Sequence, residues 1–162
     1  MRIAVGADHA GYRLKEEVKR LLDSLDLPWV DFGTDSEVSV DYPDIAVKVA
    51  RAVASGAFDR GILVCGTGIG MAMAANKVGG IRAASVGDLP SARLSREHND
   101  ANVLTLGGRT TEVDRAREIV RTFLTTSFEG GRHQRRIDKV MALDAGNRGL
   151  SPSLPDEPAP GD

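Results

Sequence analysis

The sequence predicts an α/β fold built on a parallel, doubly wound sheet, and two observations support that prediction. Short apolar segments that suit strands alternate with longer segments in which apolar residues recur at helical spacing. The segment at residues 62–64, Ile-Leu-Val, is continuously apolar, which is typical of a strand buried on both faces. Strands that alternate with helices in this way form parallel sheets. The predicted strands span residues 2–6, 28–32, 62–64, 81–86 and 102–106.

The helices predicted between these strands are supported by apolar faces and by residues that favour helix starts. Leu14, Val18 and Leu22 recur on one face of the first helix. Pro43 lies in the first turn of the second helix, where proline is tolerated, and Asp88 caps the helix that follows the fourth strand. The predicted helices span residues 12–25, 41–56, 71–75, 90–98, 111–124 and 132–143.

Length and composition indicate one domain without a nucleic-acid or membrane role. The chain has 162 residues, a net charge of −2 and one cysteine. A net charge this small does not indicate the strongly basic surface that binds nucleic acid. No apolar run approaches the ~18 residues that span a membrane. A single cysteine forms no internal disulfide and fits a reducing compartment, and the first residues form a strand and not a signal peptide. We expect a cytoplasmic protein with a domain at residues 1–144 and a disordered Pro- and Gly-rich tail at 145–162.

Residues 65–70, Cys-Gly-Thr-Gly-Ile-Gly, directly follow the third strand and precede a helix. Glycines permit a tight turn, and a helix that starts there directs free N–H groups and a partial positive charge at the turn. Such a turn suits an anion, and the same environment stabilises a thiolate at Cys65 beside the hydroxyl of Thr67. The alternative is a tight connection with a buried cysteine that acts as a small apolar residue.

Ligands of parallel sheets bind outside the carboxyl ends of the strands. This rule brings three segments to one edge of the sheet, which are Asp8 with His9, residues 65–70, and residues 107–109. His98 instead precedes the fifth strand, at the wrong end of that strand to meet Cys65 easily within one subunit. That mismatch suggests that His98 serves a neighbouring subunit as an acid or base, and the alternative is a helix C-terminal cap.

Arg132 and Arg136 are four residues apart and therefore share one face of the last predicted helix. Two guanidinium groups on one face suit a phosphate, which arginine holds bidentately. The alternative is a solvated face paired with acidic residues such as Asp138. His133 is expected to point elsewhere on this helix and to be structural or exposed.

Six blocks of the sequence, taken together and in order, resemble the family of ribose-5-phosphate isomerase B and the galactose-6-phosphate isomerase subunits, over roughly residues 1–145. The blocks are Gly-Ala-Asp-His-Ala-Gly at 6–11, Asp-Tyr-Pro-Asp at 41–44, Cys-Gly-Thr-Gly-Ile-Gly at 65–70, Ala-Ala-Asn-Lys at 74–77, Ser-Arg-Glu-His-Asn-Asp at 95–100 and Glu-Gly-Gly-Arg-His at 129–133. The resemblance implies a Rossmann-like three-layer sandwich with a five-stranded parallel sheet, a homodimer or dimer of dimers, and neither a metal nor another cofactor. It also implies aldose–ketose isomerisation of ribose 5-phosphate and ribulose 5-phosphate, or of a related sugar phosphate, through a cis-enediolate.

The resemblance further implies roles for single residues. Cys65 matches the catalytic base, and Thr67 matches a group beside the reacting oxygens. Members with serine at the cysteine position use a glutamate on the following helix, which this chain lacks. Asp8 and His98 match the groups that open the sugar ring, with His98 and Asn99 supplied by the partner subunit. The matching substrate-binding residues are His9, Tyr42, Gly66, Gly68, Ile69, Gly70, Asn99, Arg109, Arg132 and Arg136.

A non-catalytic nucleotide-binding module is the second interpretation of the glycine turn. Gly66 and Gly68 follow a strand, and Asp88 lies about twenty residues further on, as in dinucleotide-binding folds. The third glycine of that fingerprint is replaced by Met71.

The choice among ribose, allose, galactose and shorter sugar phosphates depends on pocket depth.

Overall fold

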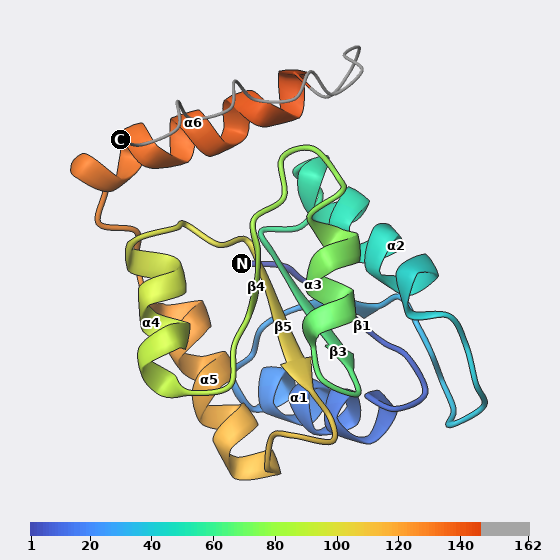
Figure 1. Ribbon diagram of the computed structural model, residues 1–162. Helices are drawn as coiled ribbons and strands as arrows, with labels where there is room; N and C mark the ends of the chain where they lie inside the picture. The colour runs from blue at the N-terminus through green and yellow to red at the C-terminus, as the bar shows by residue number, and fades with distance from the viewer. Residues whose placement is uncertain (147–162) are drawn as a thin grey trace, which may run out of the picture.

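The computed structural model describes residues 1–146, which form a five-stranded parallel sheet with helices on both faces (Figure 1). The strands are β1 Ile3–Ala7, β2 Trp29–Asp31, β3 Arg60–Cys65, β4 Ala83–Ser85 and β5 Val103–Gly107. The helices are α1 Tyr12–Ser24, α2 Tyr42–Ala54, α3 Ile69–Ala75, α4 Leu89–Glu97, α5 Val113–Thr125 and α6 Arg132–Gly146. The predicted fold class and strand number are confirmed. The tail predicted at 145–162 falls on residues that, from 147 onward, lie outside the described part.

The strand order is β2-β1-β3-β5-β4, so the strand that carries Cys65 is central. Ala7 of β1 is level with Val64 of β3, and Cys65 is level with Gly107 of β5. Three neighbouring strands therefore end at the same level, and the segments that follow them meet at one edge of the sheet. This confirms the expected gathering of Asp8, the glycine turn and the loop after β5.

The core has two halves because β3 is covered on both faces. Ile62 and Val64 pack into the half formed mainly with α1 and α5. Leu63 and Cys65 pack into the half formed with α2 and α3. All four side chains are buried, and for residues 62–64 the continuous apolar run predicted this.

Two asparagines shorten the fourth strand relative to the predicted 81–86. The amide group of Asn102 accepts from the N–H of Arg82 at 2.8 Å and donates to the carbonyl of Gly80 at 2.8 Å. Asn76 in turn bonds both the N–H and the carbonyl of Ala83, at 2.7 and 2.9 Å. Side chains thus hold this segment where strand pairing was expected, and the first residue of β4 is Ala83.

Helix α6 lies across the amino ends of the strands, at the opposite end of the sheet from the glycine turn (Figure 1). Ile137 is buried, whereas Val140 and Leu143 are 55% and 67% exposed. A groove of about 460 Å³ lies beneath the helix, with Ile81 and Ala84 among the residues that line it. Within residues 1–146, no helix combines the length and apolar character that crossing a membrane requires.

Candidate active site

Cys65 is the last residue of β3, and its sulfur accepts a backbone hydrogen bond. The N–H of Gly68 donates to Sγ at 3.2 Å, and Cys65 is only 5% exposed. A donor aimed at the sulfur stabilises a thiolate more than a thiol, because the sulfur then carries the negative charge. The turn therefore directs a backbone N–H at the sulfur of Cys65 at the edge of the sheet.

The backbone of Gly68 requires glycine for two reasons. Its φ is +81°, in the left-handed region, and a Cβ here would lie 3.0 Å from the backbone carbon of Leu106. The hydroxyl of Thr105 also donates to the carbonyl of Gly68 at 2.8 Å. These contacts fix the turn against β5 and so determine where its N–H groups point.

Tyr42 and Thr67 border the same turn. Tyr42 opens α2, and a Cβ on Gly70 would lie 2.8 Å from its ring, so the phenol covers the start of α3. The hydroxyl of Thr67 lies 3.4 Å from the N–H of Ile69, and both residues are exposed. The side chains of Tyr42 and Thr67 therefore both reach solvent at the turn.

Asp8 and His9 follow β1 on the neighbouring strand. Asp8 is 6% exposed, and its Oδ1 accepts from the N–H of Gly11 at 2.9 Å. Nδ1 of His9 accepts from the N–H of Val40 at 3.3 Å, so the neutral ring carries its proton on Nε2. His9 can thus donate a hydrogen bond from Nε2 to an anion.

Arg109 reaches the turn from β5. Its N–H donates to the carbonyl of Gly66 at 3.0 Å, and the N–H of Gly108 donates to the carbonyl of Cys65 at 2.7 Å. The guanidinium of Arg109 lies 3.6 Å from where a Cβ added to Gly66 would be. Arg109 therefore adds a positive charge directly beside the turn.

His98, Asn99, Arg132 and Arg136 lie at the other end of the sheet, where α4 ends and α6 begins (Figure 1). A strand of six residues such as β3 spans roughly 20 Å. Because β3 and β5 are neighbours, the separation from Cys65 runs along the strands. The predicted mismatch within one subunit is confirmed, and His98 also occupies the C-cap of α4, as the alternative expected.

The two arginines of α6 form no ion pair within residues 1–146. Arg132 and Arg136 are exposed, and neither forms an ion pair with another of residues 1–146. Asp138, which the alternative interpretation paired with them, accepts instead from Gln134 at 2.7 Å. The face is therefore solvated, as the alternative expected, but Asp138 does not pair with either arginine.

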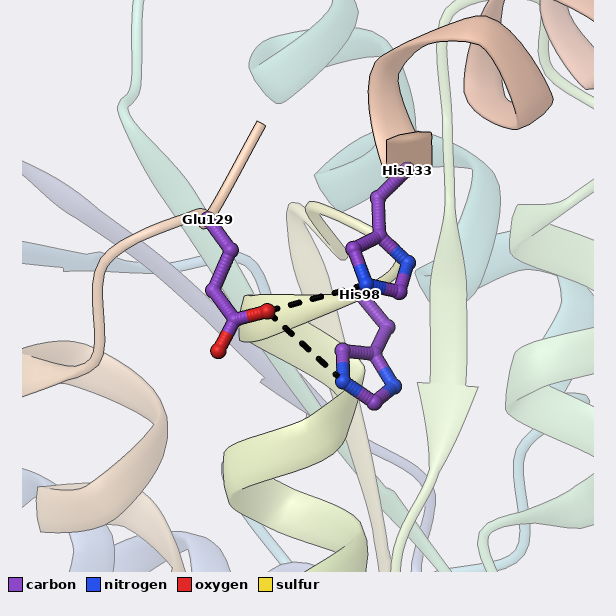
Figure 2. A group of neighbouring side chains, drawn as sticks. All are labelled: His98, Glu129 and His133. Atoms are coloured by element: carbon purple, nitrogen blue, oxygen red, sulfur yellow. Dashed lines mark ion pairs between the residues drawn. The ribbon is translucent and has the colours of Figure 1, made fainter. Parts of the chain in front are cut away.

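His133 is buried rather than exposed, and its ring stacks on His98 with centroids 4.1 Å apart and an angle of 7° between the planes (Figure 2). Loss of hydration, then the neighbouring His98 and Arg132, lower the pKa of His133 below its ordinary value, and Glu129 only partly opposes them. His133 is thus a neutral ring at neutral pH. Sequence reasoning missed this contact and the position of Glu129 beside both rings, although Glu-Gly-Gly-Arg-His was one of the blocks singled out.

The match to a family model covers residues 3–140, and the family is described as ribose/galactose isomerase. The chain belongs to this family. It is 46% identical over 143 residues to ribose-5-phosphate isomerase B of Escherichia coli, covering 88% of this chain and 96% of that protein.

Two solved structures extend the likeness to the isomerase fold. Ribose-5-phosphate isomerase B of Clostridium thermocellum has a TM-score of 0.90 at 50% identity and covers 91% of this chain and 99% of its own. The enzyme of Mycoplasma genitalium, solved with bound ribulose 5-phosphate, has a TM-score of 0.86 at 43% identity, with coverages of 89% and 96%. Both likenesses agree with the resemblance found in the six sequence blocks.

In this member of the isomerase family, one group of side chains resembles a metal site. The ligand atoms of His98, Glu129 and His133 lie within 4.8 Å of one another. However, the Nε–H of Arg132 donates to Nε2 of His133 at 3.3 Å, which places the positively charged guanidinium beside that nitrogen. Parallel imidazole rings also direct their lone pairs side by side and not toward a common point. Nε2 of His133, which already accepts from the Arg132 guanidinium, is therefore a poor ligand for a cation.

The dinucleotide-binding interpretation does not fit the turn of this isomerase. Met71, which stands where that fingerprint has its third glycine, is fully buried in the core half with α2. Its side chain fills the space into which that glycine allows a helix and a strand to pack closely. The turn instead leaves Cys65, Thr67 and Arg109 beside one another.

Proposed function

We propose that this chain interconverts ribose 5-phosphate and ribulose 5-phosphate by aldose–ketose isomerisation. Its relatives carry the name ribose-5-phosphate isomerase B, and one was solved with ribulose 5-phosphate bound. The observation that carries the proposal is the hydrogen bond from Gly68 to the sulfur of Cys65, because it prepares a base at the edge of the sheet where ligands bind.

The reaction moves protons without net oxidation, so it needs no redox cofactor. The Cys65 thiolate removes the proton from C2 of the open-chain aldose, and the C2–H electrons form the C1–C2 double bond of an enediolate. The charge that develops on O1 is stabilised by free N–H groups of the turn between Gly66 and Gly70 and by the hydroxyl of Thr67. The thiol then returns its proton to C1, while the proton on the C2 hydroxyl passes to O1. The product is the ketose.

The ring-opening step requires a proton on the ring oxygen and removal of one from the C1 hydroxyl. Asp8 is available within the same chain, whereas His98 lies at the far end of the sheet. We propose that His98 and Asn99 reach the site from a second copy of the chain. A two-fold dimer makes this exchange reciprocal and forms two composite sites.

The surface at both ends of the sheet supports such a homodimer. Ile69 and Met73 of α3 are 58% and 65% exposed, and Val140 and Leu143 of α6 are exposed to a similar degree. Apolar side chains grouped in this way are typical of protein interfaces. The groove beneath α6 offers further surface that a partner subunit can cover.

The phosphate group is proposed to lie between residues of both copies. His9 and Arg109 supply donors beside the turn, and Arg132 and Arg136 supply charges that have no carboxylate partner within residues 1–146. Binding energy from this remote group can orient C1 and C2 over Cys65. The one cysteine of the chain fits a reducing compartment, so we propose a cytoplasmic location.

An isomerase assay over five-, six- and four-carbon sugar phosphates tests the proposal directly. We expect ribose 5-phosphate to be converted with the highest kcat/KM and NAD or ATP to give no thermal stabilisation. Absence of turnover on every sugar phosphate, with the protein folded by circular dichroism, would overturn the proposed function.

A further inference from the structure

Glu129 lies beside the stacked imidazoles of His98 and His133, and both Nε2 atoms face its carboxylate (Figure 2). Its Oε2 is 3.9 Å from Nε2 of His98 and 3.6 Å from Nε2 of His133. Figure 2 also shows that the second nitrogen of each ring, Nδ1, points away from the carboxylate. One negative charge therefore faces the same side of two histidines that come from different elements.

The backbone holds Glu129 in this place. Its N–H donates to the carbonyl of Glu97 at 3.1 Å, which ties the loop to the last residue of α4, directly before His98. Gly130 and Gly131 follow with φ of +67° and +56°, which residues other than glycine rarely adopt. These two glycines turn the chain into α6 and place His133 over His98.

His133 does not compete with His98 for the carboxylate. Its Nε2 already accepts from Arg132, so in the neutral ring that nitrogen carries no proton to donate. The buried, neutral His133 instead forms a flat wall that fixes the plane of the His98 ring. The hydrogen-bonding capacity of the carboxylate is thus left for Nε2 of His98.

We propose that Glu129 is a positioning residue for His98, which keeps the proton of the neutral ring on Nε2 and presents Nδ1 as the atom that exchanges protons with the sugar. Carboxylates orient catalytic and metal-binding histidines in the same way in other proteins. This inference rests on the proposed function for its catalytic meaning. The tautomer and the orientation, however, are properties of the protein alone.

The 3.9 Å between Nε2 of His98 and Oε2 of Glu129 is longer than a hydrogen bond. Movement of the Glu129 side chain alone is enough to form one. Its side chain is 53% exposed and is therefore free to rotate about its terminal torsions, whereas His133 is fixed by burial. Hydrogen bonds of catalytic groups are often long without substrate and shorten in the complex.

The test measures the tautomer of His98 by long-range ¹H–¹⁵N NMR on the full-length chain. The chain has three histidines, so single substitutions of His9 and His133 assign the spectrum. At a pH where the rings are neutral, we expect wild-type His98 to be mainly the Nε2–H form. Glu129→Gln and Glu129→Ala should each raise the Nδ1–H fraction at least twofold. Glu118→Gln is the matched control, because Glu118 is similarly exposed and, among residues 1–146, forms an ion pair with Arg115 alone, on α5.

Activity provides the second readout. On ribose 5-phosphate, Glu129→Gln should lower kcat about tenfold with little change in KM, since general acid–base contributions of this kind are worth 10² or more in full. Glu129→Asp should recover part of the loss. An unchanged tautomer in Glu129→Gln and Glu129→Ala would overturn the inference, as would unchanged kcat in both. If wild type converts no sugar phosphate, the proposed function fails, and the NMR result still decides whether Glu129 orients His98.

Discussion

The N–H of Gly68 donates to the sulfur of Cys65 at 3.2 Å, and this contact links the backbone of the turn to the chemistry of the thiol. The turn adopts this form because Gly68 has a positive φ and packs against the backbone of Leu106. The site thus depends on backbone geometry as much as on the reactive side chain. Substitutions at Cys65 and at Gly68 separate these two contributions.

Removal of the thiol tests the proposed base. Cys65→Ala should lower kcat at least 10³-fold and leave ribose 5-phosphate binding nearly unchanged, because the thiol acts in the transition state. Iodoacetamide should inactivate wild type, and substrate should slow that inactivation. Steady-state kinetics with calorimetric binding provide the check, and near-normal turnover in the variant would refute the assignment.

Substitution at the turn tests the backbone contribution. Gly68→Ala forces an alanine into φ of +81° against Leu106, so we expect a loss of about 1–3 kcal/mol in the free energy of unfolding together with most of the activity. Gly87→Ala is the control, because a Cβ there meets no atom within 4 Å. Denaturant titration should show a near-zero change for the control, and equal losses in both variants would contradict the argument.

The arginines of α6 are predicted to recognise the phosphate. Arg132→Ala or Arg136→Ala should raise KM for ribose 5-phosphate at least tenfold, while turnover of unphosphorylated ribose should change far less. Arg20→Ala is the control, because Arg20 is exposed on α1 and pairs with Glu17 on the same helix. If both substrates lost activity equally, the two arginines would be structural and not phosphate ligands.

The elements that could be predicted from the sequence are those that local patterns determine. The turn from Cys65 to Gly70 follows a continuously apolar strand, and register alone brings Asp8 and Gly107 beside it. The contact between His98 and His133 is different, because it joins α4 to α6 across 35 positions of the chain and depends on how the two helix ends pack. No periodicity reports such packing, so Glu129 and the burial of His133 emerged only from the structure.

Lys15 and Asp31 form an ion pair that should make stability depend on pH. Lys15 is fully buried, and its Nζ lies 2.6 Å from Oδ2 of Asp31. Burial by itself raises the pKa of Asp31, but hydrogen bonds from Lys15, the Gly33 N–H and Lys19 outweigh it and leave the pKa below the ordinary 3.8. As the pH falls, Asp31 is therefore protonated in the unfolded chain before it is protonated in the folded chain. The contribution of the ion pair to stability is present above pH 3.8 and is lost as the pH falls through the lower folded pKa.

Asp31→Asn should remove this acid-dependent part and also destabilise the protein at neutral pH, because the buried Lys15 ammonium loses its counter-charge. Thermal melts between pH 2.5 and 7 should thus converge for wild type and variant at the acid end. Parallel curves over that range would show that the pair does not titrate on folding. Asp26→Asn, in the turn after α1, is the control and should leave the pH dependence unchanged.

The last prediction concerns the sharing of sites between subunits. Cys65 lies at the carboxyl end of β3, and His98 lies at the amino end of β5, so one chain does not bring the two together. In a reciprocal dimer, Cys65→Ala and His98→Ala should each be nearly inactive alone on the cyclic substrate. After co-refolding in equal amounts, about half of the dimers should be mixed, each with one intact site and one doubly altered site. Activity should then recover to roughly a quarter of wild type if the sites act independently. Mixed dimers seen by native mass spectrometry without any recovered activity would mean that His98 serves its own chain or acts only as the cap of α4.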